Sequence, residues 1–161
     1  MLAHASVSRW ERKYPARSER DIFAGRLTAL AARYDARILL NGEADEARAL
    51  GCAGVHWTSA TLGAATSRPR DLLVAASCHT HGDVVRASSL DVDFIVVGPV
   101  LTTPTHPTAK PIGWNGFADA IANTRVPAFA LGGLRHVDLD VAMAHGAHGV
   151  AMRRHAWPAA V

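Results

Sequence analysis

The stretch 93–113, DFIVVGPVLTTPTHPTAKPIG, decides how the rest of the chain is interpreted. It opens with the apolar run 94–97, which is rich in β-branched residues and short enough to be a buried strand rather than a helix. The chain then breaks at Gly98-Pro99 and enters a loop of threonines and prolines. Each proline restricts the residue before it to extended geometry, which stiffens the loop. A buried strand that ends in a stiff, hydroxyl-rich loop predicts a site for a polar ligand.

Similar apolar runs recur on both sides of this stretch and alternate with segments of helical periodicity. The pattern predicts strands at 37–40, 54–57, 72–76, 94–97, 128–131 and 149–152, and helices at 18–34, 43–50, 83–89, 114–123 and 137–145. The segment 58–70 is predicted to be a polar connection without a helix. Alternation without hairpin signals indicates parallel βα units, in either an open doubly wound sheet or a barrel. Six strands are too few for a closed eight-stranded barrel, which usually needs at least about 200 residues.

Length and composition indicate one soluble domain. No apolar run approaches the roughly 18–20 residues that span a bilayer, and the amino terminus lacks a signal-peptide core, so we expect a cytoplasmic protein without a membrane segment.

Seventeen basic and 14 acidic residues give a net charge of +3. The densest basic group lies near the start without an aromatic-rich strand, which argues against nucleic-acid binding. Cys52 and Cys78 lack C-x-x-C spacing and are expected to be reduced core thiols.

The last two predicted strands end in residues suited to hold an anion. Gly132 and Gly133 follow the strand 128–131, and the stretch 149–153 ends in Met152 and Arg153. Backbone N–H groups in such loops commonly bind phosphate in barrel enzymes, and glycine allows a close approach. The alternative is that these glycines serve only tight turns.

Six short motifs, in order, resemble the thiamine phosphate synthase/TenI superfamily of TIM barrels over about residues 36–155, the fourth of them combining Gly98-Pro99-Val100 with Thr103-Pro104-Thr105. They are Leu39-Leu40-Asn41, Gly54-Val55-His56, Ser77-Cys78-His79, Gly98-Pro99-Val100, Thr103-Pro104-Thr105, Ala130-Leu131-Gly132-Gly133 and Gly146-Ala147-His148-Gly149-Val150-Ala151. The amino-acid sequence of these motifs is most similar to that of TenI-like domains attached to Nudix hydrolases.

This resemblance implies a TIM-barrel-like βα fold in which the six strands are the third to the eighth. The first two strands would be lacking, so that the barrel is partial or is completed by dimerisation. Residues 1–17 would form a poorly defined segment in their place, and 18–161 the family domain. The exposed edges on the first and last predicted strands would be covered either by residues 1–17 or by a second subunit, and we expect a homodimer.

The resemblance also implies a thiamine-biosynthesis transferase or tautomerase with a phosphorylated small-molecule substrate. His79 is the catalytic candidate, because a histidine at this place is implicated in proton transfer on thiazole phosphate in the TenI branch, and Ser77 accompanies it. A structural polar cap at the strand end is the alternative. A catalytically degenerate ligand-binding module that partners a Nudix hydrolase is the alternative function.

Further residues inherit binding roles from the same resemblance. Thr103 and Thr105 match the family's threonine pair that contacts diphosphate, with His106 in the place of a lysine. Asn41 and His56 would line the same binding site at the strand ends. As turn residues, the threonines need no ligand. The substrate-binding set is completed by Gly132, Gly133, Gly149, Met152 and Arg153.

The synthase reaction requires Mg²⁺, but the family's acidic ligand positions read Gly42 and Thr61 here, and its R-x-K segment has no secure counterpart. Full synthase activity is therefore not expected. His56, His79 and His106 all fall at strand ends, but they lack paired spacing and a completing carboxylate, so no metal site is predicted.

Overall fold

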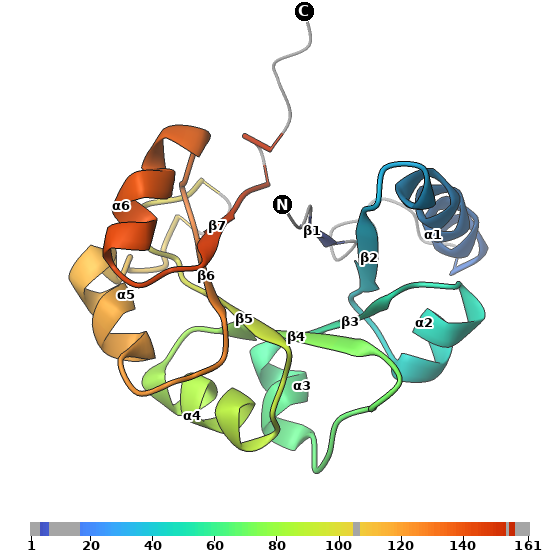
Figure 1. Cartoon of the computed structure of the whole chain (residues 1–161), viewed down its shortest axis with the longest axis horizontal. Helices are drawn as coiled ribbons and strands as arrows, with labels where there is room; N and C mark the ends of the chain where they lie inside the picture. Colours follow the sequence, from blue (N-terminus) through green and yellow to red (C-terminus); the bar gives the residue numbers. More distant parts are fainter. Residues whose placement is uncertain (1–3, 7–16, 105–106, 154, 157–161) are drawn as a thin grey trace, which may run out of the picture.

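The computed structural model describes residues 4–6, 17–104, 107–153 and 155–156. One parallel sheet of seven strands has the order β1-β2-β3-β4-β5-β6-β7, so each strand lies beside its neighbour in the sequence. The sheet is curled, and the helices surround its outer side in an arc that is open between α1 and α6 (Figure 1). This is an open TIM-barrel-like arrangement, as predicted.

The strands are β1 (His4–Ser6), β2 (Arg37–Leu40), β3 (Gly54–Trp57), β4 (Leu73–Cys78), β5 (Phe94–Val97), β6 (Ala128–Leu131) and β7 (Gly149–Ala151). The helices are α1 (Arg17–Ala32), α2 (Ala44–Ala49), α3 (Ser59–Ala64), α4 (His81–Ser89), α5 (Gly113–Ile121), the 3₁₀ helix η1 (His136–Asp138) and α6 (Leu139–Ala144). All six predicted strands are present.

The core lies between the sheet and the helices. Alternate strand residues point outward into it, among them Leu40, Val55, Val74, Ile95 and Ala130, and Phe117 of α5 packs against them fully buried. Residues of the other parity line the concave face, where Phe94 and Phe129 meet edge to face with ring centroids 5.6 Å apart. The strand register places residues of this second set beside one another on adjacent strands, for example Gly54 beside Leu73 and Ala75 beside Phe94.

Residues 4–6 cover one of the two edges, as one of the predicted alternatives has it, because β1 pairs with β2 in the register His4↔Arg37 to Ser6↔Leu39. One prediction about the first half of the chain was wrong. The segment 58–70 contains α3, where Thr58 accepts a hydrogen bond from the Thr61 N–H and Leu62 is buried. In the described part of the chain, β7 pairs with β6 alone.

Several other predicted boundaries shift by one or two residues. α4 begins at His81 rather than at residue 83, because Thr80 and Asp83 form a reciprocal capping box. The last predicted helix divides into η1 and α6, and β4 continues to Cys78. No helix among the described residues is long and apolar enough to cross a membrane.

Candidate functional site

The carboxyl ends of the parallel strands share one edge of the sheet, and most of the predicted site residues lie there. Asn41 follows β2 and is half-buried, Ser77 lies one residue before the end of β4, and His79 is the first residue beyond that strand. Met152, half-buried, and Arg153, exposed, follow β7. The fold therefore gathers side chains from the ends of three strands, β2, β4 and β7, at one mouth.

His79 is held at its backbone and at its ring. Its N–H and that of Thr80 both donate to the carboxylate of Asp83, at 2.8 and 2.9 Å. Its Nδ1 lies 2.7 Å from the carbonyl oxygen of Gly98 at the end of β5. A carbonyl only accepts, so Nδ1 carries the proton and the neutral ring presents Nε2 as an acceptor. The side chain is exposed, so this nitrogen is open to a ligand.

His56 and Ser77 form a second polar pair, on the concave face of the sheet. Nε2 of His56 lies 2.8 Å from Oγ of Ser77 on the adjacent strand. His56 is the one buried polar or charged residue in the described core, at 6% exposure. Its ring therefore orients the Ser77 hydroxyl and offers little surface of its own to a ligand.

Cys78, between Ser77 and His79, points the opposite way, into the core. Successive strand side chains alternate between the two faces, so the spacing S-x-H turns both polar groups away from the core. Cys78 has no exposed surface, and burial, with a smaller contribution from the charge of Asp83, raises the pKa of its thiol to about 12. The thiol stays protonated and takes no part in chemistry at the mouth.

The loops after β5 and β6 are bound to each other. The N–H of Val100 donates to Leu131 O at 2.8 Å, and that of Leu101 donates to Gly132 O at 3.0 Å. A Cβ on Gly132 would lie 2.6 Å from Cα of Pro99, and one on Gly133 would lie 2.5 Å from the carbonyl oxygen of Thr102. Both glycines also have positive φ, at 111° and 70°. The contact between the two loops is therefore sufficient to require glycine at both positions.

The structure separates Gly149 from the mouth. It is the first residue of β7, at the amino end of the strand, and a Cβ there would lie 3.1 Å from the Phe129 ring. Thr103 is half-buried in the loop after β5, and Thr105 and His106 lie outside the described residues.

Two residues near the mouth were missed by the sequence reasoning. Asp83 fixes the backbone of His79, and the spacing Thr80-x-x-Asp83 is a capping-box signal that could have identified it. Lys110 is an exposed cation in the loop between β5 and α5, four residues beyond the histidine that takes the place of the family's lysine. Only its position in that loop could have suggested a role.

Two carboxylates near this mouth, those of Asp83 and Asp45, are held by other partners. Asp83 is occupied by two backbone N–H groups, and Asp45 pairs with Arg48 at 2.6 Å. Thr61, at one of the family's acidic positions, shares a hydrogen bond with Thr58. No three His, Cys, Asp or Glu side chains within the described ranges group as metal ligands would. We therefore derive no step through Mg²⁺.

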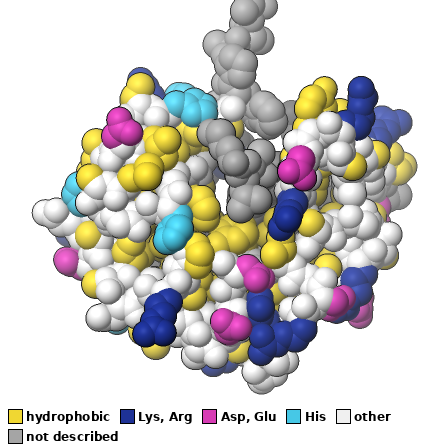
Figure 2. Space-filling view, in the orientation of Figure 1, with side chains coloured by type: hydrophobic (Ala, Val, Ile, Leu, Met, Phe, Trp, Pro, Cys, Tyr) yellow, Lys and Arg dark blue, Asp and Glu magenta, His cyan; other side chains and the backbone are white. Residues whose placement is uncertain are grey.

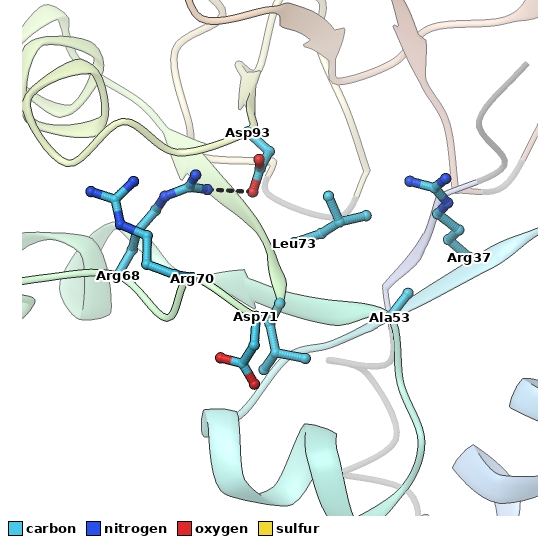
Figure 3. A pocket seen from close by; sticks show the side chains of 8 residues that line it. Arg37, Ala53, Arg68, Arg70, Asp71, Leu73 and Asp93 are labelled. Atoms are coloured by element: carbon cyan, nitrogen blue, oxygen red, sulfur yellow. Dashed lines mark hydrogen bonds and ion pairs between the residues drawn. The ribbon is translucent and has the colours of Figure 1, made fainter.

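A pocket of about 320 Å³ lies at the opposite end of the sheet, at the amino ends of β2 to β5 (Figure 3). Arg37, Arg68 and Arg70 line it together with Asp71 and Asp93. Arg68 pairs with Asp93 at 2.6 Å, and Arg70 pairs with Asp91 at 3.2 Å.

These pairs account for Arg68 and Arg70, two of the three arginines that line the pocket. Arg48 binds Asp71 through two hydrogen bonds of 2.7 and 2.8 Å, which lower the pKa of Asp71 to about 2. Helices that follow parallel strands end at this side of the sheet, and their C-termini favour cations over anions. We interpret the pocket as a structural charge network.

Sequence comparisons show the family of this chain, and a structure comparison shows its fold. The family model for thiamine monophosphate synthase matches residues 11–156. A Geobacter sulfurreducens protein described as "Putative thiamine-phosphate synthase" is 35% identical over 146 residues, which cover 88% of this chain and 68% of that protein. The thiamine-phosphate synthase of Gloeobacter violaceus is 34% identical over 148 residues, covering 89% of this chain but 43% of its relative.

Among solved structures, thiamine phosphate pyrophosphorylase from Pyrococcus furiosus superposes with a TM-score of 0.69 at 22% identity. The match covers 84% of this chain and 66% of that one. The architecture is thus that of an open (β/α) barrel with its polar residues at the carboxyl ends of the strands. The chain belongs to the thiamine monophosphate synthase family.

Proposed function

We propose that this chain binds a phosphorylated thiazole at the carboxyl ends of its strands and catalyses proton transfer on it, as in the TenI branch of the family. The observation that carries the proposal is the 2.7 Å contact between Nδ1 of His79 and Gly98 O. It fixes one tautomer and leaves Nε2 as a base at an exposed position.

A tautomerisation needs one proton removed from a carbon atom and one delivered to another. Nε2 of His79 takes the first proton and becomes part of an imidazolium, which then returns a proton to the second carbon. The Gly98 carbonyl accepts from Nδ1–H in both states, so the ring keeps its orientation throughout. A single imidazole can serve as base and then as acid, because the nitrogen that takes up the first proton also delivers the second.

The remaining groups at the mouth would position the substrate. Ser77, oriented by His56, offers a hydroxyl beside the reacting ring. The phosphate would lie toward the loops after β5, β6 and β7, where Thr103 offers a hydroxyl and Lys110 and Arg153 offer positive charge. Asn41 and Met152 would bound the pocket on its two sides.

A catalytically degenerate binding module that partners a Nudix hydrolase is the second candidate. It is favoured by the packing of Gly132 and Gly133, which the loop after β5 explains without a ligand. It is also favoured by the contacts of two nearby carboxylates, since Asp83 accepts from the His79 N–H and Asp45 pairs with Arg48.

An assay of thiazole phosphate tautomer conversion tests the proposal. We expect His79→Gln to lower kcat by at least about 100-fold with little change in KM, since general acid–base groups contribute roughly 10²–10⁴. His81→Gln is the matched control, because His81 is an exposed histidine two residues away at the start of α4. Equal turnover by the His79 variant and the wild type would remove the catalytic role.

Calorimetry on the unmodified chain distinguishes the two candidate functions. Binding of thiazole phosphate without measurable conversion supports the module, and binding with conversion supports the enzyme. Failure of thiazole phosphate and thiamine phosphate to bind would contradict both.

A further inference from the structure

A second pocket, of about 250 Å³, lies between the C-terminal ends of α5 and α6, on the amino side of β6 and β7. It is at the opposite end of the sheet from the mouth. Its described lining includes Arg125, His145 and His148 but no aspartate or glutamate. In Figure 2 the visible histidine side chains gather over α5 and α6, whereas acidic and basic side chains mix over α2 and α3.

One wall of this pocket is apolar. Ala118, Ile121 and Ala122 are spaced three and one residues apart on α5 and at its end, so they share one face of the helix. The turn after α6 packs closely against this face, because a Cβ on Gly146 would lie 3.3 Å from Cδ1 of Ile121. Val126 continues the apolar wall toward β6. The pocket therefore offers a surface for a compact apolar group.

The histidines on the other side differ in how they are held. Nδ1–H of His145 donates to the Val141 carbonyl oxygen at 2.7 Å, and its ring stacks on Trp114 with centroids 5.6 Å apart. His148 is exposed, and its backbone N–H donates to Ala128 O at 2.8 Å. Its ring has no hydrogen bond to another described residue. His145 is thus a fixed part of the wall, and His148 has a ring N–H to donate to a ligand.

Arg125 brings a positive charge to the rim of the pocket. It is exposed, and none of the ion pairs within the described ranges includes it. Helix C-termini attract cations, which is the structural alternative for an arginine between the ends of α5 and α6. Carbonyl groups at both ends already accept hydrogen bonds, however: Ile121 O from the Thr124 N–H at 3.1 Å, and Ala142 O from the Ala147 N–H at 3.0 Å. The guanidinium therefore lacks a carboxylate partner beside an apolar wall.

We propose that this pocket binds a small carboxylate with a compact apolar body. The carboxylate pairs with the guanidinium of Arg125 and accepts from the ring N–H of His148, and the apolar body packs against α5. One arginine balances one negative charge, which favours a carboxylate over a phosphate dianion. The pocket is smaller than the roughly 300–1,000 Å³ of pockets for drug-sized ligands, so the ligand is small. This site is independent of thiazole phosphate binding at the mouth.

Titration of the ¹⁵N-labelled full chain with benzoate, followed by backbone amide chemical shifts in NMR, tests the proposal. We expect saturable shifts in the segments 122–126 and 145–148, with a Kd of about 1 mM or tighter, as for a fragment-sized ligand. Benzamide has the same shape without the charge, and we expect it to bind at least about 10-fold more weakly. Phenyl phosphate should also bind more weakly than benzoate.

Three variants separate the charge from the cavity. We expect Arg125→Gln to weaken benzoate binding at least about 10-fold, as the loss of one charged hydrogen bond predicts. Arg26→Gln is the matched control and should bind as the wild type does, because Arg26 is exposed on α1 at the other end of the arc (Figure 1). Ala122→Leu enlarges an exposed side chain at the pocket wall and should abolish binding, while amide shifts elsewhere show that it is folded.

The same titrations can overturn the proposal. Shifts that do not saturate, or that occur at residues 77–79 of the mouth instead of at the pocket, would do so. An Arg125 variant that binds benzoate as tightly as the wild type would also contradict it. Equal binding of benzamide would remove the role of the charge, and tighter binding of phenyl phosphate would contradict the assignment to a carboxylate.

Discussion

The carboxylate of Asp93 lies 2.6 Å from the guanidinium of Arg68, at the amino end of the sheet. The same carboxylate accepts a hydrogen bond of 2.7 Å from the Val74 N–H. The Arg68 side chain is 13% exposed and Asp93 is 30% exposed, so this pair is screened from solvent more than its neighbours are. It joins the start of β5 to the start of β4.

We therefore expect Asp93→Asn to lower the free energy of unfolding by about 2–3 kcal/mol, because it leaves a largely buried guanidinium with only the longer, 3.8 Å pairing to the exposed Asp91. Chemical denaturation measures the change. Asp71→Asn is the control, since the Asp71–Arg48 pair is exposed and should contribute much less. Equal effects of the two substitutions would show that burial does not distinguish the pairs.

The pair formed by His56 and Ser77 leads to a second prediction. Ser77→Ala removes the hydroxyl that Nε2 of the buried His56 contacts at 2.8 Å. We expect the free energy of unfolding to fall by about 1–2 kcal/mol and the rate of thiazole phosphate conversion to fall with it. Ser89→Ala is the control, because the Ser89 hydroxyl is exposed and bonds only to the Arg86 carbonyl among its described neighbours. A Ser77 variant as stable as this control would contradict the prediction.

The buried thiol of Cys78 predicts a dependence of stability on pH. Burial raises its pKa from the ordinary value of 9.0 to about 12. Between these two values the folded protein holds a proton that the unfolded chain has lost, so stability is complete below about pH 9 and falls as the pH rises toward 12. One such group contributes a slope of up to about 1.4 kcal/mol per pH unit.

Cys78→Ala removes this contribution, so its stability should fall less steeply than that of the wild type above pH 9. Denaturant midpoints at several pH values between 7 and 11 measure the difference. Parallel curves for the two proteins would mean that the thiol ionises as easily in the folded state as in the unfolded chain.

The fold could be predicted from the sequence wherever a strand is apolar on both faces. Runs such as 94–97 and 128–131 are buried against helices on one side and line the concave face on the other, so they appear as continuous apolar segments. β1 could not be found this way, because three residues, His-Ala-Ser, carry no periodic signal. α3 was missed because Leu62 is its one buried residue.

The candidate site was predictable in its residues but not in its contacts. The spacing of Ser77 and His79 indicates that both side chains point away from the core. Nothing in the sequence shows that His79 bonds to the Gly98 carbonyl oxygen, or that Ser77 bonds to His56. These partners lie 19 and 21 residues away, on neighbouring strands. The glycines after β6 suggested a phosphate site for the same reason: the loop that requires them follows β5, and the sequence does not show that the two loops are in contact.

Gly132 provides the last prediction, because its backbone and its surroundings both exclude a side chain. Its φ of 111° is a conformation that L-residues rarely adopt, and a Cβ would lie 2.6 Å from the backbone of Pro99. We expect Gly132→Ala to lower the free energy of unfolding by at least about 2 kcal/mol and to displace the loop after β5. Gly63→Ala is the matched control, because Gly63 lies in α3 with nothing within 4 Å of its Cβ position. Alanine there should stabilise the protein by about 0.5–1 kcal/mol. Thermal denaturation of the two variants should therefore give shifts of opposite sign, and shifts of the same sign would contradict the described packing between the β5 and β6 loops.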